Sequence, residues 1–87
     1  FEPALSVFPN PASREIFLQT AFSGDERIRS ISMADVSGRI VGFWSGGLAP
    51  DADGRLRLAL PDCPAGVYFL KMETGGKVLS RKVVLQN

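Results

Sequence analysis

Few side chains in this sequence are of a type that could carry out chemistry, and those few lie apart. Cys63 is the only cysteine, and the chain has no histidine. A thiol becomes a nucleophile when a neighbouring base or positive charge favours the thiolate, and histidine is the usual base near neutral pH. Without histidine, Ser-His and Cys-His pairs and histidine-based zinc sites are excluded. We therefore expect Cys63 to be a half-buried packing residue, and we expect no enzyme activity.

A second candidate for chemistry is the acidic segment Asp51-Ala52-Asp53-Gly54, with Asp62 further on. Alternating carboxylates near a glycine are able to wrap a calcium ion, as in the EF-hand loop, where the glycine is the sixth residue and a glutamate the twelfth. Here the glycine is the fourth residue, and Arg55 takes the place of a ligand. We expect a solvated turn at this position, and neither a metal nor another cofactor in the domain.

Trp44 and Tyr68 are the aromatic candidates for ligand or core contacts. Trp44 stands beside Gly46-Gly47, a position that would suit a sugar-stacking platform in a carbohydrate-binding domain. Such platforms generally need more than one ring side by side, and strand alternation predicts that Phe43 points to the opposite face. Tyr68 is expected in the core, with its hydroxyl bonded to a backbone group. A sugar-binding function therefore stays an alternative that depends on one ring.

The composition is that of an ordinary soluble globular domain: 87 residues, of which 45% are hydrophobic and 22% charged. No apolar run is long enough to span a bilayer. The sequence begins at Phe1 rather than Met, which indicates a piece of a longer protein. We expect one domain over residues 1–87, with residues 1–4 as the remnant of a linker. The single cysteine allows no disulfide within the chain.

Positive charge gathers in the last part of the chain, although the net charge is only +1. The charged residues there are Lys71, Glu73, Lys77, Arg81 and Lys82. As a nucleic-acid footprint this pattern is weak, because Phe69 is the only aromatic residue among the lysines. We expect a local positive face and no nucleic-acid partner.

Short runs rich in β-branched and aromatic residues, separated by turn formers, predict about seven strands and no helix. Pro9-Asn10-Pro11 ends the first run because prolines remove ladder donors, and residues 23–26 are predicted to be a turn. The predicted strands are residues 5–8, 15–19, 28–34, a run that ends at Trp44, 56–60, a run through Tyr68 to Met72, and 78–86. This pattern favours an all-β antiparallel sandwich of two sheets.

The last two strands are predicted to form a hairpin around Gly75-Gly76. In that register Met72 faces Leu79, Leu70 faces Arg81, and Tyr68 faces Val83. The predicted inner residues are Tyr68, Leu70, Met72, Leu79, Val83 and Leu85, and the outer ones are Lys71, Glu73, Ser80, Lys82 and Gln86. A shift by one residue would bury Ser80 and Lys82 instead. Arg81 is the exception on the inner face, and we expect it near a sheet end, where its head reaches water. We expect this hairpin to be a central strand pair.

The segment Asp35-Val36-Ser37-Gly38-Arg39 predicts a three-residue hairpin loop built on a type I turn. Asp35 is expected to accept backbone hydrogen bonds, and Gly38 to supply the left-handed residue. With that loop, Ile31 and Met33 share a face with Val41 and Phe43.

Four motifs occur in an order that resembles the C-terminal sorting domains of the type IX secretion (Por) system of Bacteroidota. They are Val7-Phe8-Pro9-Asn10-Pro11-Ala12, the run from Ile31 through Asp35-Val36-Ser37-Gly38-Arg39, the run from Leu60 through Pro64-Ala65-Gly66-Val67-Tyr68, and Arg81-Lys82-Val83-Val84-Leu85. The family residues among them are Pro9, Asn10, Pro11, Asp35, Gly38, Arg39, Gly66 and Tyr68. The segment Leu60-Pro61-Asp62-Cys63-Pro64 departs from the plainer Leu-Pro-Ala-Gly that is usual in the family.

The resemblance implies an immunoglobulin-like sandwich that follows a cargo domain in a secreted Gram-negative protein. The implied partners are the outer-membrane translocon and a sortase that removes the domain and anchors the cargo. The implied location is the periplasm in transit, then the cell surface or the medium. The alternatives are a carbohydrate-binding sandwich and a structural accessory domain of a larger secreted enzyme.

The sorting signal is expected on the polar face and end of the final strand. The predicted docking residues are Lys71, Arg81, Lys82 and Gln86. Positive charge is concentrated there, and the family signal lies toward this end. Arg81 is expected to contribute if its head escapes the core.

Overall fold

The computed structural model describes residues 5–20, 28–46, 48–51 and 53–86, and all its regular elements are strands. The strands are β1 (Leu5–Phe8), β2 (Glu15–Thr20), β3 (Ile28–Ala34), β4 (Ile40–Ser45), β5 (Arg55–Ala59), β6 (Gly66–Thr74) and β7 (Val78–Leu85). The described part of the chain contains no helix that is long and apolar enough to cross a membrane. The predicted linker at residues 1–4 and the predicted turn at residues 23–26 lie outside the described residues.

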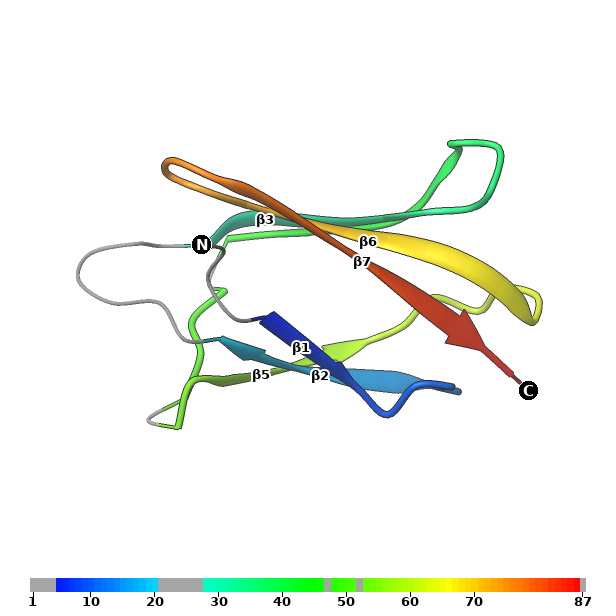
Figure 1. Ribbon diagram of the computed structural model, residues 1–87, viewed down its shortest axis with the longest axis horizontal. Coiled ribbons are helices and arrows are strands. Elements are labelled where there is room, and N and C mark those ends of the chain that lie inside the picture. Colours follow the sequence, from blue (N-terminus) through cyan, green and yellow to red (C-terminus); the bar gives the residue numbers. More distant parts are fainter. Residues whose placement is uncertain (1–4, 21–27, 47, 52, 87) are drawn as a thin grey trace.

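The strands form two antiparallel sheets that lie face to face (Figure 1). One sheet has the order β1-β2-β5 and the other the order β4-β3-β6-β7. The inner faces form one core because apolar side chains alternate with polar ones along each strand. Its fully buried large side chains are Ile16, Leu18, Ile31, Met33, Leu70, Met72 and Val83. The predicted two-sheet sandwich of seven strands is confirmed.

The hairpin of β6 and β7 has the predicted register. Tyr68 pairs with Val83, Leu70 with Arg81, and Met72 with Leu79. The Thr74 amide donates to the Lys77 carbonyl at 2.9 Å, which closes the two-residue turn. Every predicted inner residue except Arg81 is buried, and the predicted outer residues are exposed or half-buried.

The prediction that this hairpin is a central pair is wrong for β7, because β6 lies inside the sheet and β7 forms its edge. Strands adjacent in sequence pair readily, but their pairing does not say which of them takes a further neighbour. Here β3 pairs with the other side of β6. The outer edge of β7 is therefore open to contacts from elsewhere in the chain.

The predicted face of Phe43 on β4 is wrong, whereas Val41 is half-buried against the core, as predicted. The loop forms as expected, and Ala34 pairs with Ile40, but the register shifts between Met33 and Ala34, so that Met33 pairs with Gly42. Val41 is thus the extra residue of a β-bulge, and a bulge of one residue reverses the faces of all that follows. Trp44 pairs with Ile31 on the inner face. Phe43 points outward and is 63% exposed.

Candidate functional site

The side chain of Asn10 covers part of the open edge of β7. Its amide nitrogen donates to the Lys82 carbonyl at 3.2 Å, and its amide oxygen accepts from the Val84 backbone N–H at 3.0 Å. One side chain therefore supplies the donor and the acceptor that a neighbouring strand would supply. Within Pro9-Asn10-Pro11 both prolines lack a backbone N–H, and Asn10 provides the available donors.

Ala12 continues this contact with its backbone. Its N–H donates to the Val84 carbonyl and its carbonyl accepts from the Gln86 N–H, each at 2.8 Å. These bonds form a short parallel bridge to Leu85. The bridge buries the Ala12 methyl group, which is 1% exposed. We call the contacts of Asn10 and Ala12 with β7 the edge clamp.

Arg81 ties the same edge to the other sheet. Its Nε donates to the Leu5 carbonyl of β1 at 3.0 Å, and its Nη1 donates to the Ser80 carbonyl at 2.7 Å. The side chain is half-buried: its Nε lies in a partly buried contact, whereas its Nη1 lies at the exposed surface, in keeping with the expectation that the head reaches water. It lies at the lateral edge where β1 and β7 meet, and there a backbone carbonyl of the other sheet accepts the hydrogen bond from Nε.

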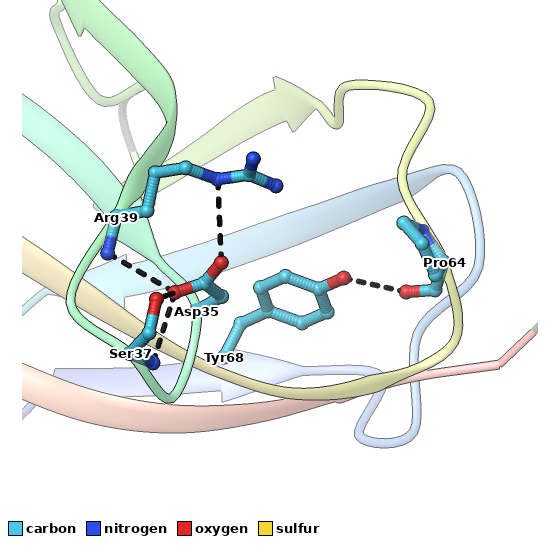
Figure 2. A network of polar contacts seen from close by, with 5 residues as sticks. All are labelled: Asp35, Ser37, Arg39, Pro64 and Tyr68. Carbon is cyan, nitrogen blue, oxygen red and sulfur yellow. Dashed lines mark hydrogen bonds and ion pairs between the residues drawn. The ribbon is translucent and has the colours of Figure 1, made fainter.

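The Asp35 loop is held by its own carboxylate (Figure 2). Asp35 Oδ1 accepts bonds from the Ser37 hydroxyl at 2.6 Å and from the Ser37 and Arg39 amides at 3.0 Å, and Oδ2 lies 3.4 Å from Arg39 Nε. The Ser37 hydroxyl is the main cause that lowers the pKa of Asp35, backbone N–H bonds and Arg39 add to it, and partial burial opposes it. Gly38 has a φ of 91°. The prediction that Asp35 is a turn former is confirmed.

The same loop occurs a second time before β5. Asp51 Oδ1 accepts from the amides of Asp53 at 2.9 Å and Arg55 at 3.1 Å, and the Gly54 amide donates to the Asp51 carbonyl at 2.9 Å. Asp51 thus has the role of Asp35, and Gly54, with a φ of 80°, has the role of Gly38. No group of three or more potential metal ligands is present in the described ranges. The Asp51 carboxylate therefore has a structural role, because it accepts the hydrogen bonds of the Asp53 and Arg55 backbone amides.

Tyr68 anchors the corner that leads into β6 (Figure 2). Its hydroxyl donates to the Pro64 carbonyl at 2.6 Å, and its ring is 6% exposed. Burial raises the pKa of the Tyr68 phenol, and the neighbouring Cys63 thiol adds to the rise. Cys63 is half-buried against the core, as predicted. Immunoglobulin domains use a similar tyrosine bond to a backbone group a few residues upstream.

Trp44 belongs to the core and not to an exposed platform. It is half-buried and packs against the buried cluster. Its indole lies over Gly42, where an added Cβ would stand 2.8 Å from Cη2 of Trp44 and 3.3 Å from Cγ of Pro61. This position removes the exposed ring on which the sugar-binding alternative depended.

The predicted docking residues do not all lie together. Lys71 and Lys82 are exposed on the outer face of the β6–β7 pair, where Lys82 pairs with Phe69 and Lys71 with Ser80. Gln86 is exposed and follows β7. Arg81 points to the other side of β7, where it is bound to Leu5. Lys71 Nζ lies 3.9 Å from Glu73 Oε1.

Sequence reasoning missed Phe43 as a member of this outer face. Cross-strand pairs place Phe43, Ser32, Lys71 and Ser80 in one row, and Ile40, Ala34, Phe69 and Lys82 in the next. The missed signal was Gly42 beside Trp44: a glycine two positions before a large ring leaves room for that ring on the same face. Once Trp44 is placed inside, Phe43 must lie outside.

The fold and these contacts define a small β-sandwich. Its last described strand, β7, is held in place by residues near the start of the chain. The sequence profile described as "Secretion system C-terminal sorting domain" matches residues 6–86. The chain therefore belongs to this family, the type IX secretion sorting domains, as the motifs indicated. Membership implies interaction with the secretion machinery and export toward the cell surface or the medium. None of the curated proteins compared with the chain matches it.

Among solved structures, the chain resembles the crystal structure of CopC from Methylosinus trichosporium OB3b. The alignment covers 97% of this chain and 91% of that chain, with a TM-score of 0.60 and 21% sequence identity. At this identity the likeness concerns the fold alone. It supports the two-sheet sandwich.

Proposed function

We propose that this domain directs a cargo protein through the outer-membrane translocon of the type IX system. A sortase then removes the domain and anchors the cargo at the cell surface, after passage through the periplasm. The observation that carries the proposal is the family match over residues 6–86. The cargo domain precedes this domain in the parent protein.

The signal is read on the folded domain, through the polar outer face and end of β7. Lys71, Lys82 and Gln86 are exposed on that side, and Lys82 has no ion pair with a described residue. Arg81 supports the face by holding β7 to β1. The edge clamp keeps the strand in place without covering the lysine side chains.

The test is a fusion of the domain to a periplasm-directed fluorescent cargo in a host that has this machinery. In the double variant Lys71→Glu with Lys82→Glu, we expect surface delivery to fall at least about tenfold because the local field is reversed. Exposed charges contribute little to folding, so the free energy of unfolding should change by about 1 kcal/mol or less. Denaturant unfolding of both purified domains checks this.

Two results would contradict the proposal. If the wild-type fusion does not reach the surface, the domain is not the signal. If the folded double variant is delivered at the wild-type yield, the lysine face is not what the machinery reads.

The domain has no hydrolytic, transfer or redox activity of its own. Support comes from the missing histidine and from the half-buried position of Cys63. The measurement is turnover of a panel of esters, peptides and glycosides by the isolated domain. Activity that disappears in Cys63→Ala or Asp53→Asn would overturn this statement.

A further inference from the structure

The outer face of the four-stranded sheet carries apolar side chains that no described residue covers. They are Phe43 at 63% exposed, Ile40 at 56%, Phe69 at 45% and Val67 at 37%, and we call them the outer patch. Between Phe43 and Ile40 on β4 and Phe69 on β6, strand β3 contributes only Ser32 and Ala34. Exposed apolar patches with a charged rim mark sites of protein contact, and aromatic side chains are enriched at such sites.

The charges around the patch indicate what its partner carries. Arg39 lies 3.4 Å from Asp35, and Lys71 lies 3.9 Å from Glu73, so these cations already face carboxylates. Lys82 stands directly opposite Phe69 and has no ion pair with a described residue. A surface that meets the outer patch therefore brings apolar groups for Phe43 and Phe69, and a carboxylate for Lys82.

We propose that the outer patch and Lys82 form the docking surface for an acidic, apolar surface of the secretion machinery. This inference rests on the proposed function and names the chemistry of the partner. Charge argues against a second copy of the chain, because a two-fold contact brings the same patch to itself, and the outer patch contains no carboxylate for Lys82. The apolar residues supply affinity, and Lys82 selects the partner.

The first test removes the rings and leaves the strands. The double variant Phe43→Thr with Phe69→Thr keeps high strand propensity at two exposed positions. We expect surface delivery of the fluorescent cargo to fall about tenfold or more, as loss of two central aromatic contacts does at an interface. Val78→Thr is the matched control, since Val78 is 58% exposed on the same face but pairs with Glu73, away from the patch. Its delivery should stay within about twofold of wild type.

The second test asks about charge at one position. Lys82→Glu should lower delivery, and Lys82→Arg should retain it, because arginine keeps the positive charge. Equal delivery by both variants would overturn the role of Lys82. If the folded Phe43→Thr, Phe69→Thr variant is delivered like wild type, the outer patch is not a docking surface, while the proposed function stands.

The third test keeps the native sequence except for one photoreactive phenylalanine analogue, placed at Phe43, at Phe69 or at Val78. Because the analogue is close in shape to phenylalanine, the first two proteins stay folded even if the threonine variant does not. A crosslink in living cells from positions 43 and 69, but not 78, to an identified component of the translocon or sortase supports the proposal. Crosslinks only to a second copy or to the cargo, or none at all, overturn it.

Discussion

At the scale of single residues, a few polar atoms fix the turns and corners of this small domain. Asp35 and Asp51 each organise a loop through one carboxylate oxygen, and Tyr68 ties β6 to the preceding corner through one hydroxyl. All three act on backbone groups close to them in the sequence. Their roles were therefore open to prediction from local motifs, and the roles of Asp35 and Tyr68 were predicted.

Tyr68→Ala is expected to be among the most destabilising substitutions. The ring is 6% exposed, so truncation leaves a cavity, and the free energy of unfolding should fall by about 3–5 kcal/mol. Tyr68→Phe keeps the ring and loses the bond to Pro64, so it should cost about 1 kcal/mol. Denaturant unfolding measures both. Trp44→Ala should lower the free energy of unfolding by less than Tyr68→Ala does, because Trp44 is only half-buried. The reverse order would show that the core does not centre on Tyr68.

Acid should weaken the Asp35 loop. The pKa of Asp35 is lowered by folding, so its contribution to stability is present above the unfolded pKa, near 4, and is lost as the pH falls through the lower folded pKa. Asp35→Asn keeps an acceptor oxygen but does not titrate. Between about pH 6 and about pH 3 the wild type should therefore lose more stability than Asp35→Asn. Parallel denaturant curves at each pH measure the difference, and equal losses would contradict the prediction.

At the scale of elements, β7 is an edge strand whose outer side is hydrogen-bonded by a segment that is not itself a strand. The edge clamp gives it hydrogen bonds from Asn10 and Ala12 on the side away from β6. An uncovered strand edge is a template for pairing with other chains, and proteins generally cover or interrupt such edges. The clamp covers the half of β7 that follows Arg81.

Removing the clamp should expose specific backbone groups of β7. In Asn10→Ala, we expect the Val84 amide to lose protection against hydrogen exchange, and stability to fall by about 1 kcal/mol. Asn10→Asp is the matched control, because it keeps the acceptor for Val84 and loses the donor to Lys82. Its Val84 amide should stay more protected than in Asn10→Ala. Unchanged exchange at Val84 in Asn10→Ala would show that the side chain does not hold this edge.

The elements were predicted as far as local patterns specify them. The β6–β7 register followed from side-chain parity around Gly75-Gly76. The β3–β4 register failed because the bulge at Val41 adds one residue, and the turn motif alone carries no sign of it. The edge clamp was missed because Asn10 lies 72 residues from Lys82, and a turn-forming asparagine looks the same with or without such a contact. For the docking face, side-chain alternation correctly placed Lys71 and Lys82 on the outer side, but it placed Phe43 on the inner side.

At the scale of the whole molecule, the two sheets are joined along one side, where β1 lies beside β7. The Arg81–Leu5 bond and the edge clamp all lie on that side. The final strand therefore contributes both to the core and to the closure of the sandwich. Loss of its second half should affect the entire fold.

Deletion of residues 83–87 is expected to unfold the domain. It removes Val83 and Leu85, which are 0% and 4% exposed, together with the strand that the clamp holds. Each buried aliphatic side chain contributes about 1.5–3 kcal/mol, against a total stability of roughly 4–13 kcal/mol for a domain of this size. Circular dichroism and denaturant unfolding measure the loss. A cooperative unfolding transition in the truncated protein would contradict this prediction and would separate folding from recognition in export experiments.

The edge clamp also sets an order of events during protein synthesis. Asn10 contacts residues that lie 72 and 74 positions later, so it leaves the ribosome well before its partners exist. The clamp can close only after Val84 has been made, and closure over such a separation is slow compared with local hairpins. The clamp therefore forms only on chains that have been made through Val84, and a shorter chain leaves the edge of β7 without these hydrogen bonds.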